Sequence, residues 1–272
     1  MEKLYIFDLD GTLYEETDHF DYYAQQLMEL VPANDRHDFW EDYLAMKAGE
    51  HTVNIGKAYD VQRDIIVTLD PLTLKAKAAH QWDGTDVPDV KSLYGEQALS
   101  FDFNSLVAIG DGWWLPFACA KHYGVTDTQA SYQATKAYMV TDKFQLSEIG
   151  GLRSFLLRLK KGHPIVLMTN SDRADVNRLL SELNLSGVFN HIISLAKKPE
   201  KTRYYFEHLH HLYQCPFEQM VSIGDNFINE IAPALMLGMK AIYLSSHDTV
   251  GHHHNLTQYR SIREWFDQVD ED

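Results

Sequence analysis

The stretch Phe7-Asp8-Leu9-Asp10-Gly11-Thr12-Leu13-Tyr14 places two carboxylates two positions apart, between an apolar run and a glycine. An extended chain points side chains i and i+2 to the same side, so a strand ending here projects Asp8 and Asp10 together beyond its carboxyl edge. Open α/β sheets bind their ligands in that crevice. Two carboxylates this close repel each other, so either one titrates at a raised pH or a cation lies between them. The stretch therefore predicts a chemically active site at the end of the first strand.

Two structural alternatives compete with this interpretation. Asp and Gly are ordinary turn residues, so a plain strand followed by a turn has a similar sequence. An EF-hand calcium loop does not fit, because its invariant glycine occupies the sixth position, whereas Gly11 is the fourth residue counted from Asp8. These residues alone leave the plain turn open.

The bulk composition indicates a folded globular protein and argues against some partners. The 272 residues are 45% apolar, which is enough for one large core or two smaller ones. The formal net charge of -15 opposes binding to nucleic acid and to anionic lipid, so we expect neither as a partner. A phosphate site in this chain must supply its own local cations.

Neither the first residues nor the two cysteines carry a sorting or redox signal. Met1-Glu2-Lys3 leads into a strand pattern without a basic and apolar leader, and there is no apolar run of bilayer length. We therefore expect a cytoplasmic protein. Cys119 and Cys215 are far apart and match no motif, so we expect both to be buried as small apolar side chains.

The C-terminal half alternates short apolar runs with amphipathic segments, which is typical of βαβ units around a parallel sheet. The pattern predicts strands at 164–168, 191–194, 220–223 and 240–244, and helices over 152–160, 176–183, 202–212 and 230–237. The expected fold is α/β, with a Rossmann-like parallel sheet core.

The segment between the first strand and this half has a different pattern. Residues 16–145 are aromatic-rich and amphipathic with few strand runs, so we expect an inserted, mainly α-helical cap domain, with loops around 81–104. The catalytic core then comprises residues 1–15 and 146–250. Residues 251–272 are expected to close on that core, starting with a solvated loop at 251–254.

Polar residues follow each predicted strand of the core. Thr169 ends the strand at 164–168, Lys198 precedes Pro199, and Asp225 follows the strand at 220–223. All carboxyl ends of a parallel sheet lie on one edge, so these residues are expected to converge with Asp8 and Asp10.

This series of motifs resembles the haloacid dehalogenase-like hydrolase superfamily, in particular the phosphatases whose helical cap is inserted between the first and second motifs. The resemblance covers residues 1–14 and roughly 145–245. The matching positions are Asp8 to Thr12 for the first motif, Thr169 for the second, Lys198-Pro199 for the third, and Gly224-Asp225 followed by Glu230 for the fourth.

The resemblance implies that Asp8 is the nucleophile and Asp10 the general acid and base. Chemistry supports both roles: an ionised carboxylate can attack phosphorus to form an aspartyl-phosphate, and a protonated one can supply the leaving oxygen with a proton. An anionic nucleophile needs a cation to approach a phosphate, and Mg²⁺ prefers oxygen ligands such as Asp8 and Asp225. The resemblance adds the backbone carbonyl of Asp10 as a further ligand.

Thr169, Asn170 and Lys198 are the residues expected to bind the phosphate. The hydroxyl can hold a phosphoryl oxygen, and the lysine offers a positive charge to the oxygens and to Asp8. A threonine after a strand is also an ordinary turn or capping residue, and a lysine is usually solvated. Lys197 is a second candidate for the lysine, but Lys198 directly precedes the proline.

The fourth motif departs from the family pattern, because Glu230 stands where aspartate is usual. Its longer side chain favours contact with metal-bound water over contact with the metal. Ile109-Gly110-Asp111-Gly112 mimics the same motif but runs into Trp113 and Trp114, so we assign Asp111 to the cap. Cap aromatics are candidates for stacking on a substrate but fit a core equally: Tyr22, Tyr23, Trp40, Trp113 and Trp114.

The sequence thus predicts a Mg²⁺-dependent phosphatase acting on a small phosphorylated metabolite. A phosphomutase or a haloacid dehalogenase of the same superfamily are the alternatives, and a dehalogenase has no need of a general acid at Asp10. A non-catalytic binding protein with this fold is a further alternative. The residues specify neither the substrate nor the oligomeric state.

Overall fold

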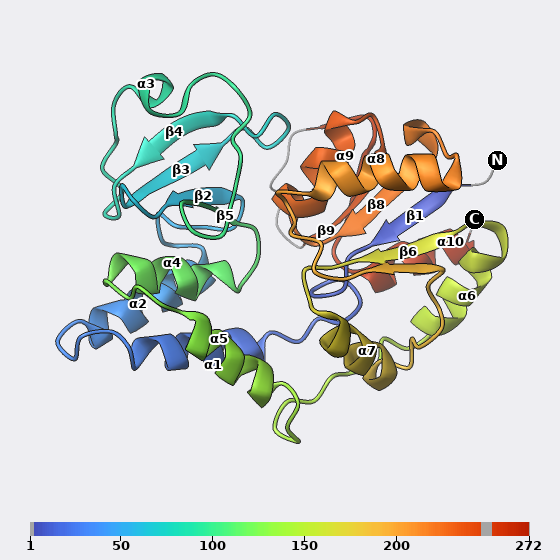
Figure 1. Ribbon diagram of the computed structural model, residues 1–272, viewed down its shortest axis with the longest axis horizontal. Coiled ribbons are helices and arrows are strands. Elements are labelled where there is room, and N and C mark those ends of the chain that lie inside the picture. The colour runs from blue at the N-terminus through green and yellow to red at the C-terminus, as the bar shows by residue number, and fades with distance from the viewer. Residues whose placement is uncertain (1–2, 246–251, 272) are drawn as a thin grey trace. The chain divides into compact units, whose positions relative to one another are not determined.

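The computed structural model describes residues 3–245 and 252–271, and the chain divides into two compact units (Figure 1). The first unit comprises Met1–Glu16 and Leu146–Asp272, and the second comprises Thr17–Gln145.

A six-stranded parallel sheet forms the centre of the first unit, in the order β10-β9-β8-β1-β6-β7. Its strands are β1 (Leu4–Phe7), β6 (Ile165–Met168), β7 (His191–Ile193), β8 (Met220–Gly224), β9 (Lys240–Leu244) and β10 (Leu256–Tyr259). Strand β1 lies between β6 and β8, with Phe7 paired to Leu167 on one side and to Ile223 on the other. The residues that follow these three strands therefore lie next to one another. The predicted parallel α/β core is confirmed.

Helices lie between the strands of this sheet as far as β9, as the alternating pattern predicted, and one more helix follows β10. They are α6 (Leu152–Gly162), α7 (Arg173–Glu182), α8 (Thr202–Tyr213), α9 (Ala232–Met236) and α10 (Ile262–Glu271), with a 3-10 turn at Phe217–Gln219 and a π-helical turn at Phe227–Ile231. The Asp172 side chain caps α7 by accepting hydrogen bonds from the backbone N–H groups of Ala174 and Asp175. The sequence pattern did not predict β10 and α10.

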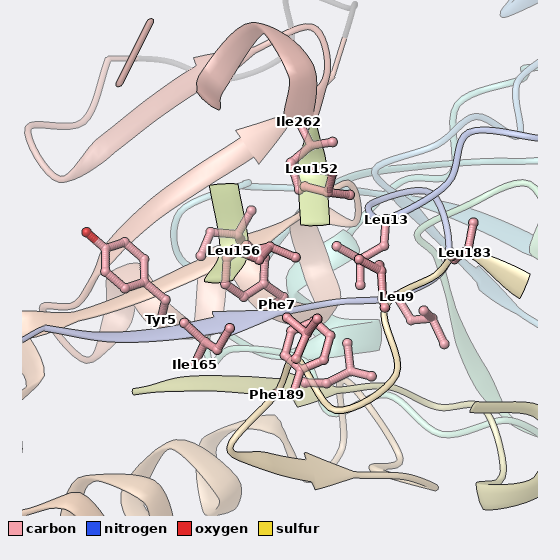
Figure 2. Packing of buried hydrophobic residues seen from close by; sticks show 14 of the residues in the cluster. Tyr5, Phe7, Leu9, Leu13, Leu152, Leu156, Ile165, Leu183, Phe189 and Ile262 are labelled. Carbon is pink, nitrogen blue, oxygen red and sulfur yellow. The ribbon is translucent and has the colours of Figure 1, made fainter. Parts of the chain in front are cut away.

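One face of the sheet packs against α6, α7 and α10 in a continuous apolar core (Figure 2). Phe7 of β1 and Ile165 of β6 lie in this core together with Leu156 of α6. Trp265 of α10 meets Phe155 edge to face at 5.2 Å between ring centroids. Each such buried side chain contributes about 1.5–3 kcal/mol. This packing fixes the position of β1, and therefore the position of Asp8, which directly follows it.

The second unit contains helices and, in addition, an antiparallel sheet that the sequence pattern did not predict. The helices are α1 (Asp18–Met28), α2 (Arg36–Ala48), α3 (Val90–Tyr94), α4 (Trp114–His122) and α5 (Gln129–Tyr138). The strands are β2 (Lys57–Asp60), β3 (Ile65–Leu69), β4 (Ala76–His80) and β5 (Leu106–Ile109), in the order β4-β3-β2-β5. Segments such as Ala76-Lys77-Ala78-Ala79-His80 have weak strand propensity, so pairing with β3 decides their conformation.

The structure also places the two cysteines, Asp111 and the aromatic residues considered for stacking. Cys119 and Cys215 are buried free thiols, as predicted. Asp111 precedes α4 and accepts a hydrogen bond from the backbone N–H of Trp113 at 2.9 Å. The aromatics considered for stacking are largely core residues: Tyr23 is buried in the core of the second unit, and Trp40, Trp113 and Trp114 pack against it.

The loop expected at 251–254 falls partly within the described residues. Gly251 lies outside the described residues, and His252, His253 and His254 belong to neither a helix nor a strand. Within residues 3–245 and 252–271, none of the helices combines the length and apolar character that a membrane span requires.

Candidate active site

Asp8 and Lys198 form a buried ion pair at the carboxyl end of β1. The Lys198 Nζ donates a hydrogen bond to Asp8 Oδ1 at 2.7 Å and another to Glu230 Oε2 at 3.0 Å. The lysine side chain is 1% exposed. Two carboxylates thus share one ammonium group in a site of low dielectric, where each interaction is stronger than in water.

The charge of this group is unbalanced, and the pKa values respond to it. Burial acts to lower the pKa of Lys198, but Asp8 and Glu230 outweigh it and raise that pKa, so the lysine is charged. Burial raises the pKa of Asp8, while Lys198 opposes the shift. Burial also raises the pKa of Glu230, to about 8, again against the effect of Lys198. Since two carboxylates face one ammonium, ionising both is unfavourable, and Glu230 keeps its proton to a higher pH than an exposed glutamate does.

Asp225 joins Asp8 and Glu230 to form an acidic cluster. One ligand atom from each of the three residues lies within 4.8 Å of the others. Gly11 has a positive φ of 73°, and a Cβ there would lie 2.2 Å from Asp225 Oδ2, so only glycine lets the loop pass this carboxylate. A Cβ on Gly224 would likewise lie 2.3 Å from Glu230 Oε1.

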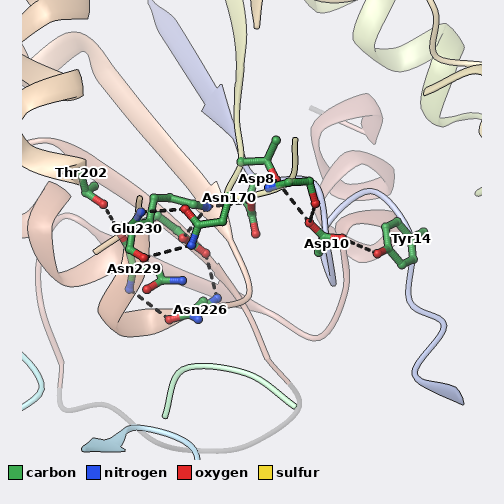
Figure 3. A network of polar contacts seen from close by, with 11 residues as sticks. Asp8, Asp10, Tyr14, Asn170, Thr202, Asn226, Asn229 and Glu230 are labelled. Carbon is green, nitrogen blue, oxygen red and sulfur yellow. Dashed lines mark hydrogen bonds and ion pairs between the residues drawn. The ribbon is translucent and has the colours of Figure 1, made fainter. Parts of the chain in front are cut away.

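The π-helical turn after β8 brings Glu230 back toward the sheet edge. Asn226 donates its backbone N–H to Glu230 Oε1 at 2.9 Å, and its side-chain Oδ1 accepts the backbone N–H of Asn229 at 3.0 Å. Thr202 at the start of α8 donates its hydroxyl to the backbone carbonyl of Asn229 at 2.6 Å. These bonds, drawn in Figure 3, anchor the turn. Glu230 therefore belongs to the acidic cluster and also accepts a hydrogen bond from Lys198.

The Asp10 side chain binds three hydroxyl groups instead of joining the cluster. Tyr14 donates to Asp10 Oδ1 at 2.5 Å, while Ser171 and Thr169 contact Asp10 Oδ2 at 3.1 and 3.3 Å. Burial raises the pKa of Tyr14 well above its usual value, so its phenol stays protonated and donates. The sequence interpretation named Thr169 but missed Tyr14 and Ser171. The sequence feature that could have indicated them is their closeness to site residues: Tyr14 lies four residues after Asp10, and Ser171 lies two residues after Thr169.

Asn170 holds the backbone of Lys198. Its Oδ1 accepts the Lys198 N–H at 2.7 Å, and its Nδ2 donates to the Lys198 carbonyl at 3.0 Å. The loop after β6 is thereby tied to the loop that carries the lysine. The Asn170 side chain thus holds the lysine loop in place. Its contact with phosphate stays a prediction.

The expected residues therefore divide into two groups at one sheet edge. Asp8, Lys198, Asp225 and Glu230 form the charged group, and Asp10 with Thr169 forms the hydroxyl-bonded group. Lys197 is exposed, whereas Lys198 is the residue whose Nζ reaches Asp8. Thr169 is fully buried, with its hydroxyl on Asp10. The expected phosphate contact of Thr169 and the metal contact of the Asp10 carbonyl stay predictions.

Comparison with known proteins identifies the family of the chain. A sequence profile of haloacid dehalogenase-like hydrolases matches residues 2–238. The chain belongs to the haloacid dehalogenase-like hydrolase family. As a member of this hydrolase family it shares its fold with many solved structures. A search of curated proteins found no significant match.

Two of the similar structures illustrate the extent of the likeness. One is a haloacid dehalogenase-like family hydrolase from Xanthomonas campestris, 16% identical with a TM-score of 0.50, and the match covers 99% of this chain and 95% of that one. Another is the L-2-haloacid dehalogenase RSc1362, 12% identical with a TM-score of 0.50 and 99% of both chains covered. At these identities the likeness shows the fold of this haloacid dehalogenase-like hydrolase and leaves its reaction open.

Proposed function

We propose that this hydrolase is a Mg²⁺-dependent phosphatase that acts on a small phosphorylated metabolite. The acidic cluster carries the proposal. Asp8, Asp225 and Glu230 with Lys198 have a formal charge of -2 when all four are ionised, which suits a divalent cation. Carboxylate oxygens are the ligands that Mg²⁺ prefers, so the residues present fit this ion. Asp8 and Asp225 would hold it, with Glu230 as a further acidic group, and it would neutralise charge on a bound phosphate.

The residues of the chain supply the remaining chemistry. An oxygen of ionised Asp8 attacks phosphorus, and the bond from phosphorus to the leaving oxygen breaks while Asp10 gives that oxygen its proton. The product of this step is an aspartyl-phosphate on Asp8 and a free alcohol. Water then attacks the phosphorus and passes a proton to Asp10, which releases inorganic phosphate and restores Asp8. Lys198 holds Asp8 in place and offers positive charge to the phosphoryl oxygens.

A haloacid dehalogenase is the second candidate, because RSc1362, a protein of similar fold, carries that name. In that reaction a carboxylate displaces halide from carbon, and the departing halide needs neither a proton nor a cation. Asp10 would then have no leaving group to protonate, and the acidic cluster around Asp8 would need no cation. A phosphomutase would use the same first step but transfer the phosphoryl group to a second substrate hydroxyl instead of to water.

The deciding experiment measures which ion is released. We expect the protein to release phosphate from 4-nitrophenyl phosphate with Mg²⁺, to stop in EDTA, and to lose activity in Asp8→Asn. Chloride release from L-2-chloropropionate is measured in parallel. Chloride release without phosphate release would overturn the proposal in favour of the dehalogenase. With ¹⁸O-labelled water, one labelled oxygen in the phosphate product separates hydrolysis from phosphoryl transfer between substrates.

A cytoplasmic location stays a prediction.

A further inference from the structure

Both oxygens of the Asp10 carboxylate are bound by hydroxyl groups that come from two separate parts of the chain (Figure 3). Tyr14 belongs to the loop after β1 and binds Oδ1, whereas Thr169 and Ser171 belong to the loop after β6 and contact Oδ2. A carboxylate bound at one oxygen can still turn about its bond to Cβ. Bonds to both oxygens from opposite segments set its rotation as well as its place.

Tyr14 is the most constrained of the three hydroxyl donors. Its side chain is 0% exposed and lies in the apolar core of the first unit with Leu9 and Leu13. The ring therefore cannot move without disturbing the packing of that core. Its hydroxyl also makes the shortest of the three contacts, at 2.5 Å.

We infer that Tyr14 is a positioning residue, which holds Asp10 in the orientation that exchanges a proton with the leaving oxygen. This inference rests on the proposed phosphatase function. A general acid must lie within hydrogen-bond reach of the leaving oxygen, and a displacement of about 1 Å is enough to slow a reaction by about 100-fold. Ser171 performs the same task from the other side of the carboxylate.

The test is the dependence of rate on the leaving group in Tyr14→Phe, which removes one hydroxyl and keeps the ring. A series of substituted phenyl phosphates is used, from phenyl phosphate to 2,4-dinitrophenyl phosphate. A poor leaving group needs the proton and a good one does not. The quantity compared is kcat/KM, because it reports only the first step, in which the leaving group departs. We expect kcat/KM for phenyl phosphate to fall by about tenfold, a part of the 100- to 10,000-fold that a general acid contributes. We expect kcat/KM for the dinitrophenyl ester to change by less than about twofold.

Tyr59→Phe is the matched control. Tyr59 is 1% exposed and donates to a carboxylate oxygen of Asp64 at the same 2.5 Å, but in the second unit. It should lose comparable stability in urea unfolding and keep the leaving-group dependence of the wild type. An equal loss of kcat/KM across the phosphate series in Tyr14→Phe would overturn the inference, since a structural defect slows the first step of all esters alike.

Two further variants keep the test decisive. Ser171→Ala should show the same selective loss for poor leaving groups, and it serves if Tyr14→Phe does not fold. In the Asp10→Asn background, Tyr14→Phe should cause no further selective loss, because there is no acid left to position. If the wild type hydrolyses none of the esters, the proposed function itself fails. If the wild type is active and neither Tyr14→Phe nor Ser171→Ala is selective, the positioning inference alone fails.

Discussion

Replacing Gly11 by alanine tests whether the loop after β1 sets the place of Asp225. The new Cβ would lie 2.2 Å from Asp225 Oδ2 and 2.6 Å from its Cγ, far inside van der Waals contact. The Asp225 side chain must therefore turn away from the acidic cluster. The backbone must also keep its φ of 73° with a residue that disfavours it.

The strained backbone should lower the stability of the fold, whereas the displaced Asp225 side chain should weaken Mg²⁺ binding. The left-handed backbone costs about 1–2 kcal/mol of unfolding free energy for alanine. Gly187 has the same φ of 73°, and a Cβ there would meet nothing within 4 Å. Gly187→Ala should therefore show the backbone effect alone. Disturbing the surroundings of a metal ligand typically weakens binding by about 10- to 100-fold, equal to about 1.4–2.7 kcal/mol. We expect that extra loss in Mg²⁺ binding for Gly11→Ala only.

The assay combines urea unfolding in EDTA with calorimetric titration of Mg²⁺ into each folded variant. Both alanine variants should lose similar stability, whereas Gly11→Ala should bind Mg²⁺ at least about tenfold more weakly than Gly187→Ala. Equal Mg²⁺ affinity in the two variants would refute the reasoning that Gly11 keeps Asp225 within the cluster.

Three further outcomes are expected from urea unfolding. Lys198→Ala leaves Asp8 and Glu230 buried without their cation and should destabilise the protein by about 3–5 kcal/mol, and a loss below about 1 kcal/mol would contradict the buried pair. Burial raises the pKa of Glu230 from 4.5 in the unfolded chain to about 8, so its stabilising effect is complete below pH 4.5 and is lost as the pH rises to about 8. In EDTA, Glu230→Gln should remove this fall of stability between pH 5 and 8, and an unchanged pH profile would count against the shift. Asp172→Ala should cost about 1 kcal/mol through loss of the α7 cap, with activity kept.

The core of the first unit could be predicted from the sequence because its signals are local. A strand buried on both faces is an apolar run, and the helix that covers it has apolar residues at helical spacing. The predicted runs at 164–168, 191–194, 220–223 and 240–244 correspond to β6, β7, β8 and β9 within one residue at each end. The weaker run Leu256–Tyr259 became a strand only by pairing with β9.

The composition of the site could be predicted, but most of its contacts could not. Asp8, Lys198 and Asp225 each follow or adjoin a strand end, and a parallel sheet brings those ends together. The adjacent proline favoured Lys198 over Lys197, and the loop agrees: Lys197 is exposed, with a positive φ of 52°, and Lys198 is buried. The clamp of Asn170 on the Lys198 backbone joins residues 28 positions apart, and no local pattern marks it.

What the sequence by itself determined is the parallel core, the order of its elements and the set of carboxylates at its edge, because periodicity and motif spacing are properties of neighbouring residues. Only the tertiary structure decided that the second unit contains the sheet β4-β3-β2-β5, that Tyr14 and Ser171 bind Asp10, and that Glu230 shares Lys198 with Asp8. Antiparallel pairing, burial and the sharing of one charge depend on residues distant along the chain, so they exist only once the chain has folded.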